Sequence, residues 1–260
     1  MAPSAADSVA LVTGAARGIG LAVSRALAAE GMRVAALDRD GRALLDSVAA
    51  QRREGHDVHG TVVELSDSKA VEQTVAGVES SLGPITTLVS VAGILRVGPV
   101  CDFSDRDWSD TFASNVSAAF YVCRSVATRM ISRRGGAIVA VGSNAAAVAR
   151  TNMAAYAASK AALLSFMRCL GLELSGFGIR CNVVSPGSTD TEMQREFWRQ
   201  TDGPAEIIAG NSLSYRVGIP LQRMACAEDI ANAVLFLSSE RARHITLHDL
   251  RVDGGATLGA

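Results

Sequence analysis

The 260-residue chain has no apolar run that approaches the length of a membrane-spanning helix. Its first residues also lack the basic and apolar blocks of a secretory signal. The formal net charge is −1 and both signs are interspersed, which argues against a polybasic patch for nucleic acid or a membrane surface. We therefore expect a cytoplasmic protein with neither a membrane nor a nucleic-acid partner.

The cysteines are scattered, and no pair forms a C-x-x-C motif. Their odd number argues against a disulfide framework, so we expect mostly buried thiols in a reducing compartment. His244 and His248 suggest a metal pair, but the sequence offers no evident third ligand and we expect no metal. The five cysteines are Cys101, Cys123, Cys169, Cys181 and Cys226.

Apolar residues make up 48% of the chain, enough for a sizeable core. Short β-branched apolar runs alternate with amphipathic segments, and no repeat or linker interrupts them. This alternation predicts one doubly wound α/β domain over residues 1–260, with a parallel seven-stranded sheet and helices on both faces. The predicted strands are 9–12, 33–37, 58–63, 87–91, 137–141, 180–184 and 245–252. The predicted helices are 18–30, 41–53, 67–82, 105–133, 151–174 and 228–238.

The segment 187–220 breaks this regularity and is richer in polar and turn-forming residues. Long irregular segments of this kind more often have a function than not. We expect a helical substrate flap there.

A glycine-rich loop follows the first predicted strand and opens a helix. Gly14, Gly18 and Gly20, with Arg17 and Ile19 between them, have G-x-x-x-G-x-G spacing. Glycines there let the backbone approach a pyrophosphate, whose charge is favoured at a helix N-terminus. The strand before and the helix after this loop predict a dinucleotide site.

An acidic residue ends the second predicted strand. Asp38 lies 18 residues beyond Gly20, where a carboxylate can bind both ribose hydroxyls and would repel a 2′-phosphate. NAD is therefore favoured over NADP, although Arg39 could either pair with such a phosphate or be a solvated loop charge. Glu64 and Leu65 are placed to border the adenine, or else Glu64 is an ordinary surface carboxylate at a strand end.

Tyr156 and Lys160 are four residues apart, and Ser143 ends an upstream strand. Residues at this spacing share one face of a helix. A tyrosine with its ordinary pKa near 10 is a poor base, but a neighbouring ammonium and a cationic cofactor would favour the phenolate. Ser143 would hold the substrate oxygen. The pattern predicts a hydride-transfer site.

With this loop, Asp38, Asn115, Ser143 and Tyr156-x-x-x-Lys160 in order, the chain resembles the short-chain dehydrogenase/reductases over nearly its full length. The resemblance implies an NAD(P)-dependent Rossmann fold and a homotetramer. It implies that Tyr156 accepts the proton, Lys160 lowers its pKa and holds the nicotinamide ribose, and Asn115 anchors a water relay. The purely structural alternatives are a turn cap for Ser143, a helix kink for Asn115 and a half-buried core position for Tyr156.

The family's Asn-Asn-Ala-Gly segment reads Ser90-Val91-Ala92-Gly93 in this chain. Ala92 and Gly93 still allow close passage of the cofactor, but a polar tie to the neighbouring strand is expected to be missing. Pro186, Gly187, Thr189 and Thr191 resemble the family's segment against the nicotinamide.

Longer stretches resemble one subgroup of the family, which oxidises the C3 hydroxyl of a dihydroxylated cyclohexadiene carboxylate for catechol siderophores. These stretches are 92–96, 180–194 and 244–259. A small carboxylated substrate requires a cation, and Arg96 and Arg150 are the leading candidates, each with the alternative of an ordinary surface charge. The resemblance adds Met193 over the ring and Gln194 as a polar contact, with Ser188 close by in the same segment.

Two other functions are considered. A related dehydrogenase would act on a carboxylated cyclohexadiene in which an amine replaces the C2 hydroxyl, and the sequence does not separate it from the diol enzyme. A non-catalytic NAD-binding redox sensor is less consistent with an intact serine, tyrosine and lysine, since a sensor needs no proton acceptor.

Overall fold

The chain folds around one parallel sheet of seven strands in the order β3-β2-β1-β4-β5-β6-β9. The computed structural model describes residues 8–198 and 203–259, with the side chains of 196–198 left out. The strands of the sheet are β1 (Val9–Thr13), β2 (Arg33–Asp38), β3 (Val58–Val62), β4 (Ile85–Ser90), β5 (Gly136–Val141), β6 (Ile179–Pro186) and β9 (Asp249–Val252). The predicted doubly wound α/β fold is confirmed.

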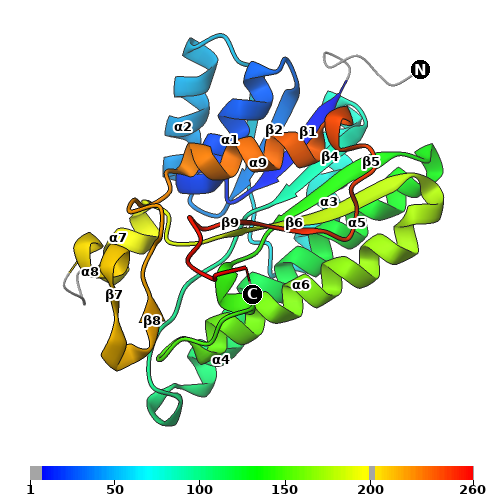
Figure 1. Cartoon of the computed structure of the whole chain (residues 1–260). Coiled ribbons are helices and arrows are strands. Elements are labelled where there is room, and N and C mark those ends of the chain that lie inside the picture. The colour runs from blue at the N-terminus through cyan, green and yellow to red at the C-terminus, as the bar shows by residue number, and fades with distance from the viewer. Residues whose placement is uncertain (1–7, 199–202, 260) are drawn as a thin grey trace.

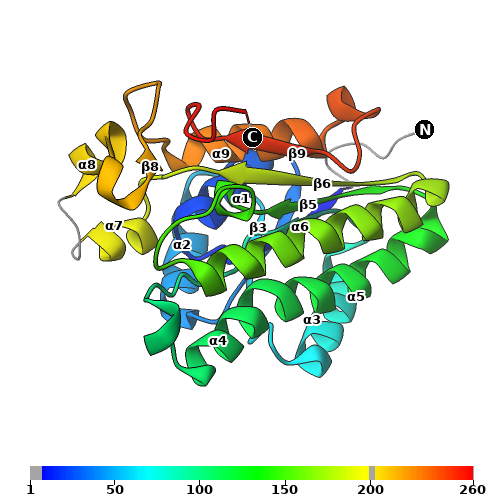
Figure 2. The same cartoon turned by 60° about the horizontal axis from the view of Figure 1, so that its bottom comes forward.

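Helices cover both faces of the sheet (Figures 1 and 2). One apolar cluster packs α3, α5 and α6 against one face, and a second packs α1, α2 and α9 against the other. Strands covered in this way need apolar side chains on both faces, and all five residues of β1 are buried. The helices are α1 (Gly18–Ala29), α2 (Gly41–Arg53), α3 (Ser68–Leu82), α4 (Asp105–Phe112), α5 (Ala118–Arg133), α6 (Ala154–Leu174), α7 (Glu192–Trp198), α8 (Pro204–Ala209) and α9 (Ala227–Ser238).

The strand order reverses between β1 and β4, which lie side by side although β2 and β3 come between them in the chain. In open α/β sheets, ligands bind in the crevice that such a reversal opens at the carboxyl ends of the strands. The glycine-rich loop leaves β1 at this point. The topology therefore places the predicted dinucleotide site at the reversal.

Two predicted elements differ from the structure. The predicted helix 105–133 is interrupted by one wider π turn, η3 (Ala113–Ser117), between α4 and α5. The predicted strand 245–252 is shorter, because Leu247 has a φ of 62° and only Asp249–Val252 joins the sheet. Before that point the chain still follows β6, through the bond from Leu247 N to the Cys181 carbonyl.

The expectation of mostly buried cysteines is wrong. Cys123 and Cys181 are buried, whereas Cys101, Cys169 and Cys226 are exposed free thiols. Each exposed cysteine lies on an outward position: Cys101 in a surface turn, Cys169 on the outer side of α6, and Cys226 before α9.

Beyond β6, the chain forms α7, α8 and a small antiparallel hairpin of β7 (Gly210–Asn211) and β8 (Arg216–Val217). These elements gather at one end of the molecule, beyond the sheet (Figure 1). Residues 199–202 of the expected flap lie outside the described part of the chain. Over the residues that the structure describes, no helix is long and apolar enough to cross a membrane.

Candidate active site

A cleft of about 580 Å³ opens at the carboxyl ends of the central strands. Every residue predicted above to contact cofactor or substrate lines it. Asn115 is the one predicted site residue that does not line the cleft, because it lies one layer behind it. Segments that are far apart in the chain thus meet at one place.

The glycine-rich loop is too close to its surroundings for side chains. A Cβ on Gly20 would lie 1.9 Å from the Gly14 carbonyl oxygen, and Gly14 has a φ of 67° and a backbone contact with Ala92. Gly18 starts α1 with a φ of 53°, in the left-handed region that favours glycine. The loop thus reaches the N-terminus of α1 without side chains at its three glycines, which leaves its backbone open to the pyrophosphate of a dinucleotide.

Asp38 is held at the end of β2 by two backbone donors. Its carboxylate accepts hydrogen bonds from Ala16 N at 3.1 Å and from Asp40 N at 3.0 Å. These bonds fix the side chain where it borders the cleft, in position for ribose hydroxyls. The next residue, Arg39, lies 3.9 Å from Glu64, so its charge already has an acidic neighbour.

A polar tie to the neighbouring strand is present despite the altered Ser90-Val91-Ala92-Gly93 segment. The Thr13 hydroxyl accepts hydrogen bonds from Val91 N at 3.0 Å and Ala92 N at 3.1 Å. Because Thr13 ends β1 and is fully buried, it holds the turn after β4 in place. This tie comes from Thr13 and is separate from the one that an asparagine side chain in the 90–93 segment would make.

The environments of Tyr156 and Lys160 differ from the sequence expectation. Burial raises the pKa of Tyr156, while a hydrogen bond with Ser143 and the charge of Arg150 oppose that rise. Lys160 is buried, donates to the Val141 carbonyl at 2.9 Å, and stands 5.8 Å from the centroid of the Tyr156 ring. Burial lowers the pKa of Lys160 to about 8. Two cations therefore lie near the phenol: Arg150, whose charge opposes the rise in the pKa of Tyr156, and Lys160, whose ammonium faces the ring.

Asn115 occupies the π turn and holds the loop after β4. Its side chain accepts from Ile94 N at 2.7 Å, and donates to the Ile94 carbonyl at 3.0 Å and to Ser159 Oγ at 2.9 Å. A π turn is often found at functional sites, since it turns one side chain out of the helical register. Two of these bonds satisfy the backbone of Ile94, which agrees with the structural alternative given above, a helix kink at Asn115. They also link the loop to the helix that carries Tyr156.

The two candidate arginines for a carboxylate have different surroundings. Arg150 is half-buried and donates to Asn144 Oδ1 at 2.9 Å. Arg96 is exposed and lies 3.5 Å from Asp107. A half-buried cation bonded to a neutral amide is the better partner for a substrate anion.

Met193 and Gln194 lie on the first turn of α7, which begins at Glu192. Met193 is 45% exposed and lines the cleft, where it can contact a ligand. Gln194 also lines the cleft, and its backbone N–H donates to Thr191 Oγ1 at 3.3 Å.

Sequence reasoning missed three residues of this region: Asn144, Asp253 and Arg216. Asn144 binds Arg150, and donates to Asp253 at 3.3 Å. Arg216 donates to Ser188 Oγ at 3.0 Å. Asn144 could have been found as the neighbour of Ser143, whereas nothing local places Arg216 or Asp253 beside the site.

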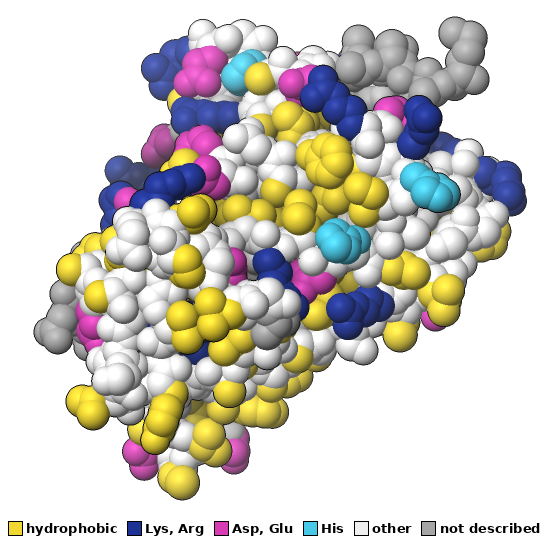
Figure 3. Space-filling view, viewed as in Figure 1, with side chains coloured by type: hydrophobic (Ala, Val, Ile, Leu, Met, Phe, Trp, Pro, Cys, Tyr) yellow, Lys and Arg dark blue, Asp and Glu magenta, His cyan; other side chains and the backbone are white. Residues whose placement is uncertain are grey.

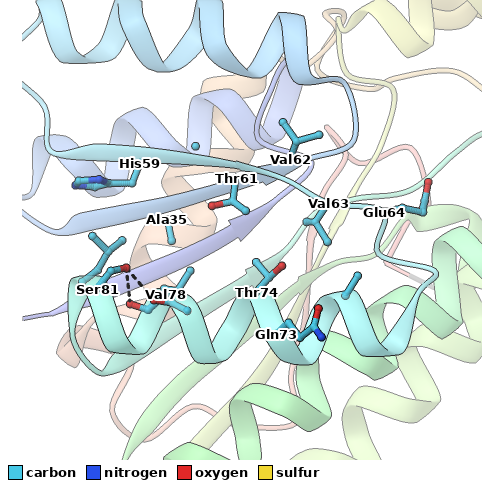
Figure 4. A pocket seen from close by; sticks show the side chains of 14 residues that line it. Ala35, His59, Thr61, Val62, Val63, Glu64, Gln73, Thr74, Val78 and Ser81 are labelled. Carbon is cyan, nitrogen blue, oxygen red and sulfur yellow. Dashed lines mark hydrogen bonds between the residues drawn. The ribbon is translucent and has the colours of Figure 1, made fainter.

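A second pocket, of about 830 Å³, lies between β3 and α3 (Figure 4). Neutral side chains such as Thr61, Gln73 and Thr74 point toward it. The Ser81 hydroxyl bonds back to the Gly77 carbonyl of its own helix at 2.8 Å. His59 and Glu64 also line this pocket, but among the described residues it contains no tyrosine–lysine pair like that of the smaller cleft. In residues 8–198 and 203–259, no cluster of potential ligands that could bind a metal was found.

Known proteins are similar to this chain in sequence and in fold. The family model for short chain dehydrogenases matches residues 8–202. The chain belongs to the short-chain dehydrogenase family. It is therefore an oxidoreductase that acts on a hydroxyl group, with a cleft for a nicotinamide cofactor.

Relatives within the family carry more specific names. The chain is 49% identical over 251 residues to 2,3-dihydro-2,3-dihydroxybenzoate dehydrogenase of Bacillus subtilis strain 168, covering 96% of each. It is 43% identical over 249 residues to the Escherichia coli K12 enzyme of the same name, again covering 96% of each. A solved structure described as gox2181 superposes with a TM-score of 0.91 at 32% identity, covering 97% of this chain and 96% of that one.

Proposed function

We propose that this protein oxidises the C3 hydroxyl of 2,3-dihydro-2,3-dihydroxybenzoate with NAD⁺, yielding 2,3-dihydroxybenzoate for catechol siderophores. The observation that carries the proposal is the grouping of Tyr156, Ser143 and Arg150 in one cleft. The pKa of Tyr156 responds to both of its neighbours there. A proton acceptor, a hydroxyl-binding group and a cation for a carboxylate are what this substrate requires. The names of the relatives agree with it.

Tyr156 accepts the proton of the C3 hydroxyl, and Ser143 holds the same oxygen. Hydride acceptance is the chemistry that a bound nicotinamide supplies. Since burial raises the pKa of Tyr156, the phenolate is scarce at neutral pH unless further positive charge is nearby. The positive charge of Arg150 and of an oxidised nicotinamide both favour the phenolate. Lys160 is positioned by the Val141 carbonyl to bind the nicotinamide ribose.

Asp38 selects NAD over NADP. Its fixed carboxylate accepts hydrogen bonds from ribose hydroxyls and repels a 2′-phosphate. Arg39 does not offset this repulsion, because its guanidinium lies within 3.9 Å of Glu64.

Arg150 binds the substrate carboxylate. Its half-buried position strengthens a charge-assisted hydrogen bond relative to one at the open surface. Arg96 remains a surface charge paired with Asp107. The redox-sensor alternative is dropped, because the chain belongs to an enzyme family and retains the groups needed for turnover.

The direct test mixes purified protein with NAD⁺ and the dihydrodiol. NADH absorbance should rise in step with 2,3-dihydroxybenzoate, which is identified by chromatography. The matching amino alcohol, 2,3-dihydro-3-hydroxyanthranilate, serves as the competing substrate. Faster turnover of the amino alcohol, or no turnover of the dihydrodiol, would refute the assignment.

We also propose that the protein works in the cytoplasm as a homotetramer. Hydrophobic side chains gather over α9 and the C-terminal segment on the face shown in Figure 3. The exposed apolar residues of these two segments include Phe236 on α9 and Leu258 near the C-terminus, which are 41% and 74% exposed. An apolar patch of this kind suits an isologous interface between copies. Sedimentation of the purified protein would measure the assembly.

A further inference from the structure

Arg216 comes from the small hairpin beyond the sheet, but its side chain reaches Ser188 in the wall of the cleft. Its neighbours Tyr215 and Val217 are 90% and 49% exposed, whereas Arg216 is half-buried. Successive residues of a strand point to opposite sides, so β8 directs Arg216 inward. There it donates to Ser188 Oγ at 3.0 Å, and Ser188 is itself a buried residue of the cleft wall.

The hairpin that carries Arg216 is firmly held. A Cβ on Gly210 would lie 2.5 Å from Gly218 N, so the two chain segments touch at the base of the hairpin. Ile219 N donates to the Ile208 carbonyl at 2.8 Å and closes that base. The position of Arg216 is therefore set by backbone packing as well as by Ser188.

The positive charge of Arg216 acts on Arg150, which lines the cleft beside Ser188 and Asn144. Burial lowers the pKa of Arg150 and the charge of Arg216 lowers it further, while the charges of Tyr156 and Asp253 oppose this. Neither arginine forms a salt bridge with any residue that the structure describes. The hydrogen-bond partners found for their guanidinium groups are neutral, Asn144 and Ser188. Glu206, an acid whose charge acts on Arg216, accepts a hydrogen bond from Asn211 instead.

We infer that Arg216 and Arg150 together bind the carboxylate of the substrate, with Ser188 holding Arg216 in place. Two like charges that have acids nearby but no direct ion pair among the described residues still repel each other, and a carboxylate between them reduces that repulsion. The two oxygens of a carboxylate match two guanidinium donors. This inference rests on the proposed function, and it adds a specificity-determining residue that the motif pattern does not contain.

The test compares two ligands that differ only in the carboxylate, 2,3-dihydroxybenzoate and catechol. Their affinities for the protein–NADH complex are measured by calorimetry for the wild type, Arg216→Gln, Arg216→Lys and Ser188→Ala. Arg223→Gln is the matched control, because Arg223 is an exposed arginine that pairs with Asp229 at 2.8 Å. NADH affinity, measured alone, reports whether each variant is folded.

Arg216→Gln should weaken binding of 2,3-dihydroxybenzoate by about 10- to 100-fold, the range for a lost hydrogen bond between charged groups. Catechol binding should change by no more than about twofold. Arg216→Lys should retain part of the affinity because it keeps the charge but not the planar fork. Ser188→Ala should show a smaller loss of the same selectivity. Arg223→Gln should change neither ligand.

Equal losses for both ligands in Arg216→Gln, or no loss for either, would overturn the inference. If Arg216→Gln does not bind NADH, the lysine and Ser188→Ala variants decide by the same criterion. Failure of the proposed function gives a different result. In that case the wild type does not turn over the dihydrodiol, while the binding comparison still reports on the arginine pair.

Discussion

The arginines on the two walls of the cleft have different kinds of partner. The cofactor wall comprises residues 14–20 and 38–40, and there Arg17 forms ion pairs with Asp40 and Glu192. These pairs are largely exposed, so they contribute little to stability and mainly orient the loop. The positive charge of Arg17 on this wall is therefore already paired with acidic side chains.

The opposite wall, where we propose that the substrate binds, contains Asn144, Arg150 and Ser188, and Ser188 accepts a hydrogen bond from Arg216. Its arginines are half-buried and bond to a neutral amide and a neutral hydroxyl. Uncompensated charge in a partly buried position costs free energy, which a bound anion recovers. We propose from this comparison that the cofactor is recognised by the glycine-rich backbone and Asp38, and the substrate carboxylate by arginines that have no direct ion pair in the described part of the chain.

Tyr156→Phe tests the proposed proton acceptor, which lines the same cleft, and should have the largest effect on activity. Removing a proton acceptor lowers kcat by about 10²- to 10⁴-fold. NAD⁺ affinity should change little, since the aromatic ring remains and only the hydroxyl is removed. Steady-state kinetics with NAD⁺ and the dihydrodiol measure the loss. An undiminished rate would show that Tyr156 is not the proton acceptor.

Lys160→Met should stabilise the fold while it destroys activity. Burial lowers the pKa of Lys160 to about 8, below its ordinary value, so near pH 7 the folded protein holds a buried charge. We expect a gain of about 3 kcal/mol in the free energy of unfolding at pH 7. Above about pH 8 the unfolded chain binds more protons than the folded one, so the stability of the wild type rises with pH. The difference in the free energy of unfolding between Lys160→Met and the wild type therefore becomes smaller.

Urea denaturation of both proteins at pH 7 and pH 9.5 measures that difference. The matched control is Lys69→Met, because Lys69 is an exposed lysine on α3. A lower stability of Lys160→Met at pH 7 would mean that the buried ammonium is better compensated than the structure indicates.

Asp38→Ala tests the cofactor wall alone. It should weaken NAD⁺ use by about 10- to 100-fold, because a charged group loses its hydrogen bonds to the ribose. NADP⁺ use should fall less or improve, since the repulsion of a 2′-phosphate is removed. Arg39→Ala serves as the control and should leave both cofactors nearly unchanged. An equal loss of kcat/KM for the two cofactors would end the assignment of NAD.

Arg150→Ala and Arg96→Ala sharpen the substrate side. Removing the half-buried Arg150 side chain should raise KM for the dihydrodiol by about tenfold or more. Arg96, whose guanidinium already faces Asp107, should change KM by less than about twofold. Unchanged kcat/KM in both variants would show that neither arginine binds the carboxylate.

Local patterns predicted the cofactor wall. Gly14, Gly18 and Gly20 carry their signal in spacing, and Asp38 follows at the end of the next strand, so short-range sequence was sufficient. The alternation of strands and helices likewise predicted the sheet.

The remaining features depend on contacts that sequence does not reveal. The π turn at Asn115 was missed because Ala113–Ser117 contains nothing that forbids an ordinary helix. Arg216 was missed because a hairpin, not a motif, brings it to Ser188. The raised pKa of Tyr156 was missed because burial outweighs its neighbours, and burial is a property of the whole fold.

A crystal structure of the protein with NADH and 2,3-dihydroxybenzoate tests the central claim most directly. The account predicts the C3 oxygen within about 2.6–3.2 Å of Tyr156 Oη, with the carboxylate directed at Arg150. A ligand whose carboxylate lies beside Tyr156, or whose ring binds outside the cleft, would contradict it.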